Sequence, residues 1–386
     1  MKQKILRTLI CFAVILQGCQ SSEPPPGTPD GVNASPIPGE PPAALATEQS
    51  TTSLEFAPLL VKSGYGFLSP WMDLYFTDPA SPYAADESGG VDGILSAKII
   101  AANETVDVAI NSLSLLILSN ALIRSKDRGV KVRVIIESDY LDANRSNLQS
   151  LIDAGIPMIG DQEKGSMDNN FIVIDNKEVW TGSIIFTRKG IYHGYNNLLN
   201  IHSQELAENY TREFDEMFIN SAFGPNVVPD TPNPVVTVEG TQIEVFFLPD
   251  DLFAARLTEL LNNAQSSIVF TAVSFSSEEF SELIRKRAGE GIRVLGIIDN
   301  FVPDPTRTSQ YELFRAAGLD VRLGNPDIVL FENVLIIDSK TVIVGTYDFS
   351  KRSELINDGN VLIIHNEAVA DKFMDEFQHI QSTAQK

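Results

Sequence analysis

Two segments of the chain carry carboxylate and amide side chains at matching places, 163 residues apart. The first begins at Asp168 and the second at Phe331, and each continues through an apolar run to an aspartate, Asp175 or Asp338. Oxygen ligands of this type suit a calcium or magnesium ion, so a metal-dependent hydrolase is one chemistry that they could support. The residues that would supply the oxygens are Asp168, Asn170, Glu332, Asn333 and Asp348.

The spacing of these acids argues against a metal site. None of the intervals matches a known metal-binding loop, and acids in so acidic a chain are more often solvated. Among the four histidines, His202 and His365 fall on predicted strands and His379 on the last predicted helix. Only His193, in a loop after the first segment, is a candidate for approaching the site. We therefore expect no metal and no other cofactor.

Both segments resemble the H-x-K-x4-D-x6-G-S-x-N motif of the phospholipase D superfamily. The aspartates and glycines of the motif are retained in both segments. The serine position holds Ser183 in the first and Thr346 in the second. Both histidines, both lysines and both asparagines of the motif are replaced. The residues at the histidine and then the lysine positions are Asp168, Phe331, Asn170 and Asn333.

The resemblance implies a chemistry that these replacements remove. In the family, one His attacks phosphorus, the other protonates the leaving oxygen, and the Lys and Asn side chains hold the phosphate. Asp168 would put a negative charge where an anionic phosphodiester must lie, and Phe331 cannot transfer a proton. The acid that orients the family's histidine is replaced by Leu198 and Gly359. We assign no catalytic residue and expect a pseudoenzyme that binds or scaffolds.

One further function stays open beside the metal-dependent hydrolase. An enzyme of the same lineage, a phosphodiesterase or phospholipase D, could have rebuilt its active site around other residues, with His193 as the remaining imidazole. The residues expected to contact a ligand, whichever function holds, are Ser183, Thr346, Asp348 and His193.

An internal repeat predicts how the two segments are positioned. Residues 102–110 match 264–272, and residues 128–137 match 290–299, both at an offset of 162, so the chain holds two copies of one unit. Each copy has a strand, a helix, a strand after a capping glycine, a second helix, two strands joined by a two-residue turn, and a closing helix. This order predicts an α/β fold. With the resemblance, it implies two tandem phospholipase D-like units, each a mixed β-sheet flanked by helices, related by pseudo-twofold symmetry.

The N-terminal 50 residues are expected to lie outside this fold. Residues 1–19 place basic residues before an apolar run too short to span a bilayer. They end in Leu-Gln-Gly-Cys, which resembles a bacterial lipobox with Cys19 as the acylated residue. Residues 20–50 are rich in Pro and Ser, which predicts a disordered tether. The remaining predicted boundaries are 71–222 for unit 1, 223–241 for a linker and 242–382 for unit 2.

Charge and anchoring limit the expected partners. The 386-residue chain has 29 basic and 51 acidic residues, and three of the basic ones lie in the predicted signal, which leaves a net charge of −25. A charge of this size repels phosphate backbones, so we expect no nucleic-acid partner. We expect an exported monomer with two packed repeats, held to a bacterial membrane or cell surface by its N-terminal acyl anchor. The ligand or protein partner is not specified by the sequence.

Overall fold

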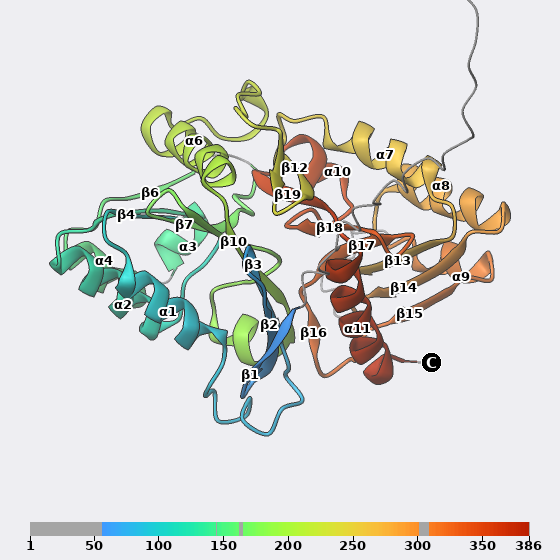
Figure 1. Ribbon diagram of the computed structural model, residues 1–386, viewed down its shortest axis with the longest axis horizontal. Helices are drawn as coiled ribbons and strands as arrows, with labels where there is room; N and C mark the ends of the chain where they lie inside the picture. The colour runs from blue at the N-terminus through green and yellow to red at the C-terminus, as the bar shows by residue number, and fades with distance from the viewer. Residues whose placement is uncertain (1–55, 144, 162–164, 301–308, 386) are drawn as a thin grey trace, which may run out of the picture. The chain divides into compact units, whose positions relative to one another are not determined.

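The computed structural model describes residues 56–143, 145–161, 165–300 and 309–385. The predicted signal peptide, Cys19 and the predicted tether lie outside the described residues. Within the described part, two mixed sheets with flanking helices confirm the predicted α/β fold class (Figure 1). The first half of the chain builds one sheet and the second half builds the other.

The first half forms a nine-stranded sheet in the order β1-β2-β3-β10-β8-β7-β4-β5-β6. Its elements are β1 (Ala57–Val61), β2 (Gly64–Leu68), β3 (Met72–Thr77), α1 (Val91–Ala101), β4 (Thr105–Ile110), α2 (Leu116–Asp127), β5 (Lys131–Ile136), α3 (Ser138–Ala143), α4 (Arg145–Asp153), β6 (Met158–Gly160), β7 (Asn170–Ile174), β8 (Glu178–Thr181), α5 (Arg188–Tyr192), β9 (Gly194–Tyr195), β10 (Asn197–His202) and α6 (Gln204–Asn220). The second helix predicted in this copy corresponds to α3 and α4.

The second half forms an eight-stranded sheet in the order β11-β12-β19-β18-β17-β13-β14-β15. Its elements are the 3₁₀ turn η1 (Gly224–Asn226), β11 (Val235–Val238), β12 (Thr241–Leu248), α7 (Phe253–Asn263), β13 (Ser267–Ala272), α8 (Glu278–Gly289), β14 (Arg293–Ile298), α9 (Tyr311–Ala316), β15 (Asp320–Leu323), β16 (Val329–Leu330), β17 (Asn333–Ile337), β18 (Thr341–Gly345), α10 (Lys351–Leu355), β19 (Gly359–His365) and α11 (Glu367–Thr383). Strand β11 falls within the predicted linker and pairs with β12, so this part of the linker belongs to the second sheet.

The two sheets repeat the same pairing. In the first, β4 is parallel to β5 and antiparallel to β7, and in the second, β13 is parallel to β14 and antiparallel to β17. The strand pairs β7–β8 and β17–β18 are antiparallel hairpins that carry the two motif segments. The repeat read from the sequence is therefore a repeat of structure.

The motif aspartates hold the hairpin turns in place. Asp175 and Asp338 are the first residues of two-residue turns and have φ angles of 54° and 56°, in the left-handed region that aspartate tolerates. The Asp175 carboxylate accepts hydrogen bonds from the backbone N–H groups of residues 103–105, and the Asp338 carboxylate accepts the same three from residues 265–267. Both aspartates therefore fasten a hairpin to the start of a central strand, which is a folding role.

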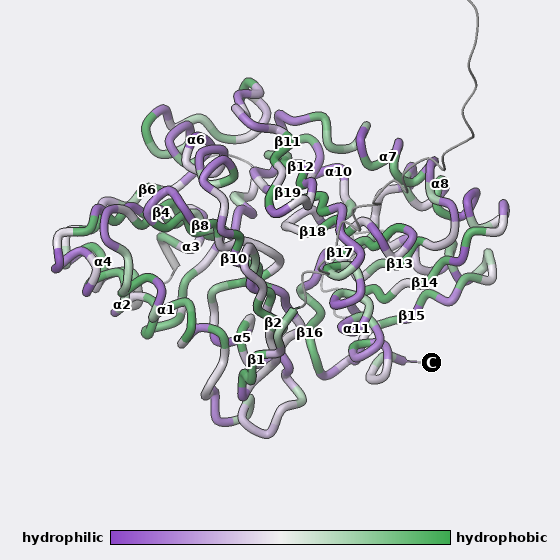
Figure 2. Tube along the Cα trace, in the orientation of Figure 1, coloured by the Kyte–Doolittle hydropathy of each residue, from purple (hydrophilic) through white to green (hydrophobic). Residues whose placement is uncertain are grey.

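The hydrophobic core is continuous across the two halves. One cluster of buried side chains includes Phe171, Tyr210 and Phe214 from the first half and Phe247 and Phe377 from the second. The ring centroids of Tyr210 and Phe247 lie 5.0 Å apart in an edge-to-face arrangement. Figure 2 shows apolar residues gathered along the central strands, such as β13 and β14. The two halves are thus packed against each other through apolar side chains.

Candidate functional site

The two motif segments are held by backbone hydrogen bonds that each half receives from the other. The N–H of Asp168 donates to the carbonyl of Asp358 at 2.8 Å, and the N–H of Phe331 donates to the carbonyl of Tyr195 at 3.0 Å. Residues 168 and 331 differ by 163, as do residues 195 and 358, so the two contacts are equivalent. This exchange supports pseudo-twofold symmetry and places the two former histidine positions at the seam between the halves.

Two fully buried asparagines reinforce the seam in the same reciprocal way. The Asn197 amide donates to Glu332 Oε1 at 3.1 Å, and the Asn360 amide donates to Asn169 Oδ1 at 2.9 Å. Asn360 Oδ1 also accepts hydrogen bonds from Thr181 at 2.7 Å and from Tyr210 at 3.0 Å. Buried amides with several partners fix one packing arrangement, because a displaced amide would be left unsatisfied.

The strand register corrects one sequence assignment. Leu199 pairs with Thr181 in the first sheet, and Leu362 pairs with Val344 in the second. The equivalent of Gly359 is therefore Asn196, three residues before Leu199, and not Leu198 as the motif comparison predicted. The position that would orient a histidine thus holds an amide in one half and no side chain in the other.

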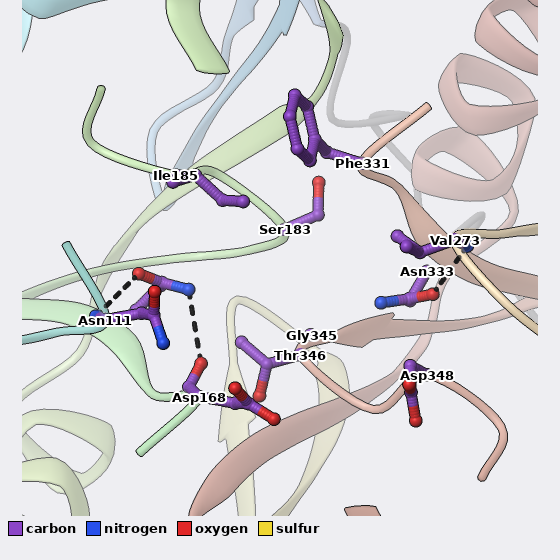
Figure 3. A pocket seen from close by; sticks show the side chains of 11 residues that line it. Asn111, Asp168, Ser183, Ile185, Val273, Phe331, Asn333, Gly345, Thr346 and Asp348 are labelled. Carbon is purple, nitrogen blue, oxygen red and sulfur yellow. Dashed lines mark hydrogen bonds between the residues drawn. The ribbon is translucent and has the colours of Figure 1, made fainter. Parts of the chain in front are cut away.

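A pocket of about 240 Å³ opens at this seam. It brings together most of the predicted site residues, from both halves (Figure 3). The lining residues are Asn111, Asp168, Asn170, Ser183, Ile185, Val273, Phe331, Asn333, Gly345, Thr346 and Asp348. Among these described residues, none has an imidazole, ammonium or guanidinium group. The pocket wall consists of carboxylates, amides, hydroxyls and apolar side chains.

The two asparagines at the former lysine positions are oriented by equivalent bonds. Asn170 Oδ1 accepts the backbone N–H of Asn111 at 3.3 Å, and Asn333 Oδ1 accepts that of Val273 at 3.0 Å. The Asn170 amide then donates to the carbonyl of Asp168 at 3.1 Å. Within the described part of the chain, the Asn333 amide nitrogen has no hydrogen-bond partner, and Figure 3 shows it directed into the pocket.

Asp168 brings a carboxylate to the pocket wall. Its two oxygens accept hydrogen bonds from Ser166 Oγ at 2.6 Å and from the Asn357 amide at 2.7 Å. Burial raises the pKa of Asp168 to about 6, and repulsion from Asp348 and Glu137 adds to this rise against the two hydrogen bonds. At neutral pH the side chain is mostly ionised, so a negative charge stands where the motif has a histidine.

The other polar candidates are held by neighbouring groups. Asp348 accepts from Ser353 Oγ at 2.6 Å and lies 3.2 Å from Ser274 Oγ. Ser183 Oγ accepts the backbone N–H of Asn197 at 3.0 Å, and Thr346 Oγ1 accepts that of Asn360 at 3.1 Å. The two hydroxyls therefore fasten the motif segments to β10 and β19 as well as lining the pocket.

Two predicted site residues lie elsewhere. His193 ends α5, and its Nε2 contacts Glu87 Oε1 at 3.1 Å on an exposed surface, so the structure does not place its ring in the pocket. Glu332 is buried outside the pocket, just before β17, where it accepts a hydrogen bond from the Asn197 amide, and burial raises its pKa to about 7. Four of the five oxygen donors of the metal hypothesis line the pocket, and Glu332 does not. Among the described residues, no group of three or more His, Cys, Asp or Glu side chains is placed to hold a metal ion.

Several residues of the site carry no motif signal. Asn111 and Val273 each follow a repeated strand, so the 162-residue offset was the one signal that could have selected them. Asp358 is 2% exposed and sits beside the pocket at the seam, where one oxygen accepts the N–H of Gly224 at 2.7 Å. Its role depends on contacts with distant segments, which spacing in the sequence does not reveal.

Comparison with known proteins agrees with this architecture. The family model described as "Cardiolipin synthase, PLD-like domain" matches residues 95–218 and 257–381, which is more than half of the chain. Two tandem copies of one domain around a shared pocket define the class. The chain belongs to the phospholipase D-like family.

Curated relatives match only part of the chain. It is similar to a phospholipase D of Rickettsia conorii, 32% identical over 139 residues, which are 36% of this chain and 65% of the relative. It is also similar to a mitochondrial cardiolipin hydrolase of Canis lupus familiaris, 31% identical over 120 residues, which are 31% of this chain and 47% of the relative. The matched segments thus span 47–65% of the length of these two relatives.

A solved structure shares the fold over most of the chain. The phosphatidylserine synthase of Haemophilus influenzae Rd KW20 superimposes with a TM-score of 0.61 at 15% sequence identity and covers 77% of this chain and 86% of its own. At this identity the likeness concerns the fold alone. Among the described residues, no helix has the length and apolar character needed to cross a membrane.

Proposed function

We propose that this protein is a lipid-anchored envelope protein that uses the phospholipase D-like fold to bind a ligand or partner without cleaving phosphodiesters. The observation that carries the proposal is the pocket wall. Carboxylate and aromatic side chains, Asp168 and Phe331, stand at the two positions where the family's chemistry needs imidazoles. Amides stand at the lysine positions, so no cation among the described lining residues offsets the charge of a phosphate.

A hydrolase of the same lineage is the second candidate. The observation that favours it is the description of the relatives, which are a phospholipase D and a cardiolipin hydrolase. Such an enzyme would need a nucleophile other than histidine at the pocket. The two candidates make opposite predictions for turnover.

The full chain, solubilised in a non-ionic detergent, is expected to show no turnover of phosphatidylcholine, cardiolipin or bis(4-nitrophenyl) phosphate above a heat-inactivated sample. The reason is that removal of a nucleophile or of its charge-stabilising partners each costs several orders of magnitude in rate. Product release is measured with and without EDTA, with an active phospholipase D as the positive control.

Wild-type turnover would contradict the non-catalytic proposal. Loss of that turnover in Asp168→Asn would indicate an enzyme with a rebuilt active site. Loss of that turnover with EDTA would indicate a metal-dependent hydrolase. The combined variant Asp168→His, Asn170→Lys, Phe331→His and Asn333→Lys serves as the matched comparison. Activity gained only by that variant supports the view that the wild-type scaffold is intact and lacks the reacting groups.

Lipid anchoring is a separate part of the proposal, and it rests on the sequence around Cys19. In a bacterial host, the full chain is expected to sediment with membranes and to resist washing with high salt, because acyl chains and not charges hold it there. The variant Cys19→Ala is expected in the soluble fraction. Equal sedimentation of the two forms would exclude an acyl anchor at this residue.

A further inference from the structure

We infer that the seam pocket is a site for a small organic cation, a primary ammonium group on a short chain that also carries an oxygen acceptor. The inference rests on the proposed function and names the chemical class of the ligand. Three features of the pocket carry it: a carboxylate on either side of the seam, an amide nitrogen that points into the pocket without an acceptor among the described residues, and apolar walls between them (Figure 3).

The carboxylates specify the charge of the ligand. Asp168 comes from the first half and Asp348 from the second, and both line the same pocket. The described partners of Asp168 are the neutral donors Ser166 and Asn357, and each carboxylate oxygen retains a lone pair for a further donor. Repulsion between the two acids contributes to the raised pKa of Asp168. An ammonium group placed in the pocket would relieve this repulsion and donate charge-assisted hydrogen bonds to the carboxylates.

The amide nitrogen of Asn333 specifies a second feature of the ligand. Asn333 is 8% exposed, and its Oδ1 is fixed by the backbone N–H of Val273. Its Nδ2 is therefore a donor that cannot turn away from the pocket and that finds no acceptor among the described residues. The Nδ2 atom faces the open pocket. An oxygen acceptor on the ligand would form a hydrogen bond with it, with a net contribution of about 0.5–1.5 kcal/mol.

The apolar walls distinguish an organic cation from a metal ion. Ile185, Val273 and Phe331 line the pocket and can contact methylene groups, whereas a hydrated metal ion gains nothing from them. Lys189 Nζ already lies 5.8 Å from the centre of the Phe331 ring, so we assign this ring an apolar contact and no cation–π role. A pocket of about 240 Å³ suits a ligand of several heavy atoms.

The test uses three probes of equal length that differ in charge: 4-amino-1-butanol, 1,4-butanediol and 4-hydroxybutanoate. Binding to the full chain in detergent is measured by calorimetry or ligand-observed NMR at pH 7.5. The amine is expected to bind in the millimolar range, as its few heavy atoms allow, and at least about tenfold more tightly than the diol. The anion is expected not to bind.

Two variants locate the site. Asp168→Asn is expected to weaken amine binding by about tenfold or more and to leave diol binding unchanged. Asn333→Leu is expected to weaken both probes, because both carry the hydroxyl acceptor. The matched control Asp371→Asn removes one negative charge from an exposed position on α11 outside the pocket and is expected to change neither.

Amine affinity is also expected to rise between pH 5 and pH 7.5. The amine stays charged throughout, while Asp168, with a pKa of about 6, passes from mostly neutral to mostly ionised. The acids that act on Asp168 from neighbouring elements are Asp348, Glu137 and Asp358, and Lys189 lies near the pocket at Phe331. Diol affinity is expected to stay flat over the same range.

Three results would overturn the inference. Equal affinity for the amine and the diol would make the pocket a polyol site. Undetectable binding of every probe at 100 mM, or amine binding unchanged in Asp168→Asn, would remove the ammonium site altogether. None of these results involves turnover. The non-catalytic proposal is therefore tested separately, by the phosphodiester assays.

Discussion

Replacement of Asn360 by alanine is expected to lower the free energy of unfolding by about 3–5 kcal/mol, measured by urea denaturation. The side chain is fully buried, and its amide oxygen accepts hydrogen bonds from Thr181 and Tyr210 while its nitrogen donates to Asn169. Removing it leaves two donors and one acceptor buried without their partner, and each such group costs about 1–3 kcal/mol. The three partners all belong to the first half, so the loss falls on the seam.

The matched control is Asn325→Ala. Asn325 accepts one exposed hydrogen bond, from the N–H of Asp327, within its own loop. Its loss is expected to change stability by less than about 1 kcal/mol. If Asn360→Ala cost no more than this control, the reciprocal contacts of the seam would not be the interactions that hold the two halves together.

Replacement of Asp358 by asparagine is expected to stabilise the protein at pH 8, by about 2–4 kcal/mol, and to have little effect at pH 5. Burial, together with repulsion from Asp161 and Asp168, raises the pKa of Asp358 to about 7 against the hydrogen bond from Gly224. Its ordinary value is 3.8. Each unit of pKa shift corresponds to about 1.4 kcal/mol, and neighbouring rearrangement reduces the total.

The sign of this effect follows from proton linkage. The folded state holds a proton on Asp358 up to about pH 7, whereas the unfolded chain loses it near pH 4, so stability falls as pH rises between these values. Asparagine retains the acceptor for Gly224 and carries no charge. Thermal unfolding of wild type and variant across pH 5–8, with Asp371→Asn as the control, measures the difference. A difference that did not change with pH would show that Asp358 is not a buried proton acceptor.

The fold could be predicted because the sequence contains two copies of the same structural unit. The constant 162-residue offset matched β4 with β13 and β5 with β14, and each pair has the same partners in its sheet. The positions of the turn aspartates could be predicted equally well, because Asp175 and Asp338 bind backbone groups that recur at the same offset. The contribution of β11 to the second sheet was missed because a short, Pro-flanked segment reads as a linker.

The site was predictable where it follows the motif and unpredictable where it depends on orientation or distant contacts. Glu332 lies between Phe331 and Asn333, which both line the pocket, and it stands directly before β17, where side chains of extended backbone alternate in direction. The sequence could therefore have predicted that Glu332 lies outside the pocket. By contrast, the ring of His193 is engaged by Glu87, which is 106 residues away in the chain, and no local pattern signals that contact.

The reciprocal hydrogen bonds between Asp168 and Asp358 and between Phe331 and Tyr195 have an evolutionary consequence. Two identical subunits related by a twofold axis must place the same residue on both sides of a shared cavity. A gene duplication that joins both copies in one polypeptide removes this constraint, so each side can mutate alone. One wall could acquire an acid and the other a phenyl ring, which yields a polarised cavity that no homodimer could build.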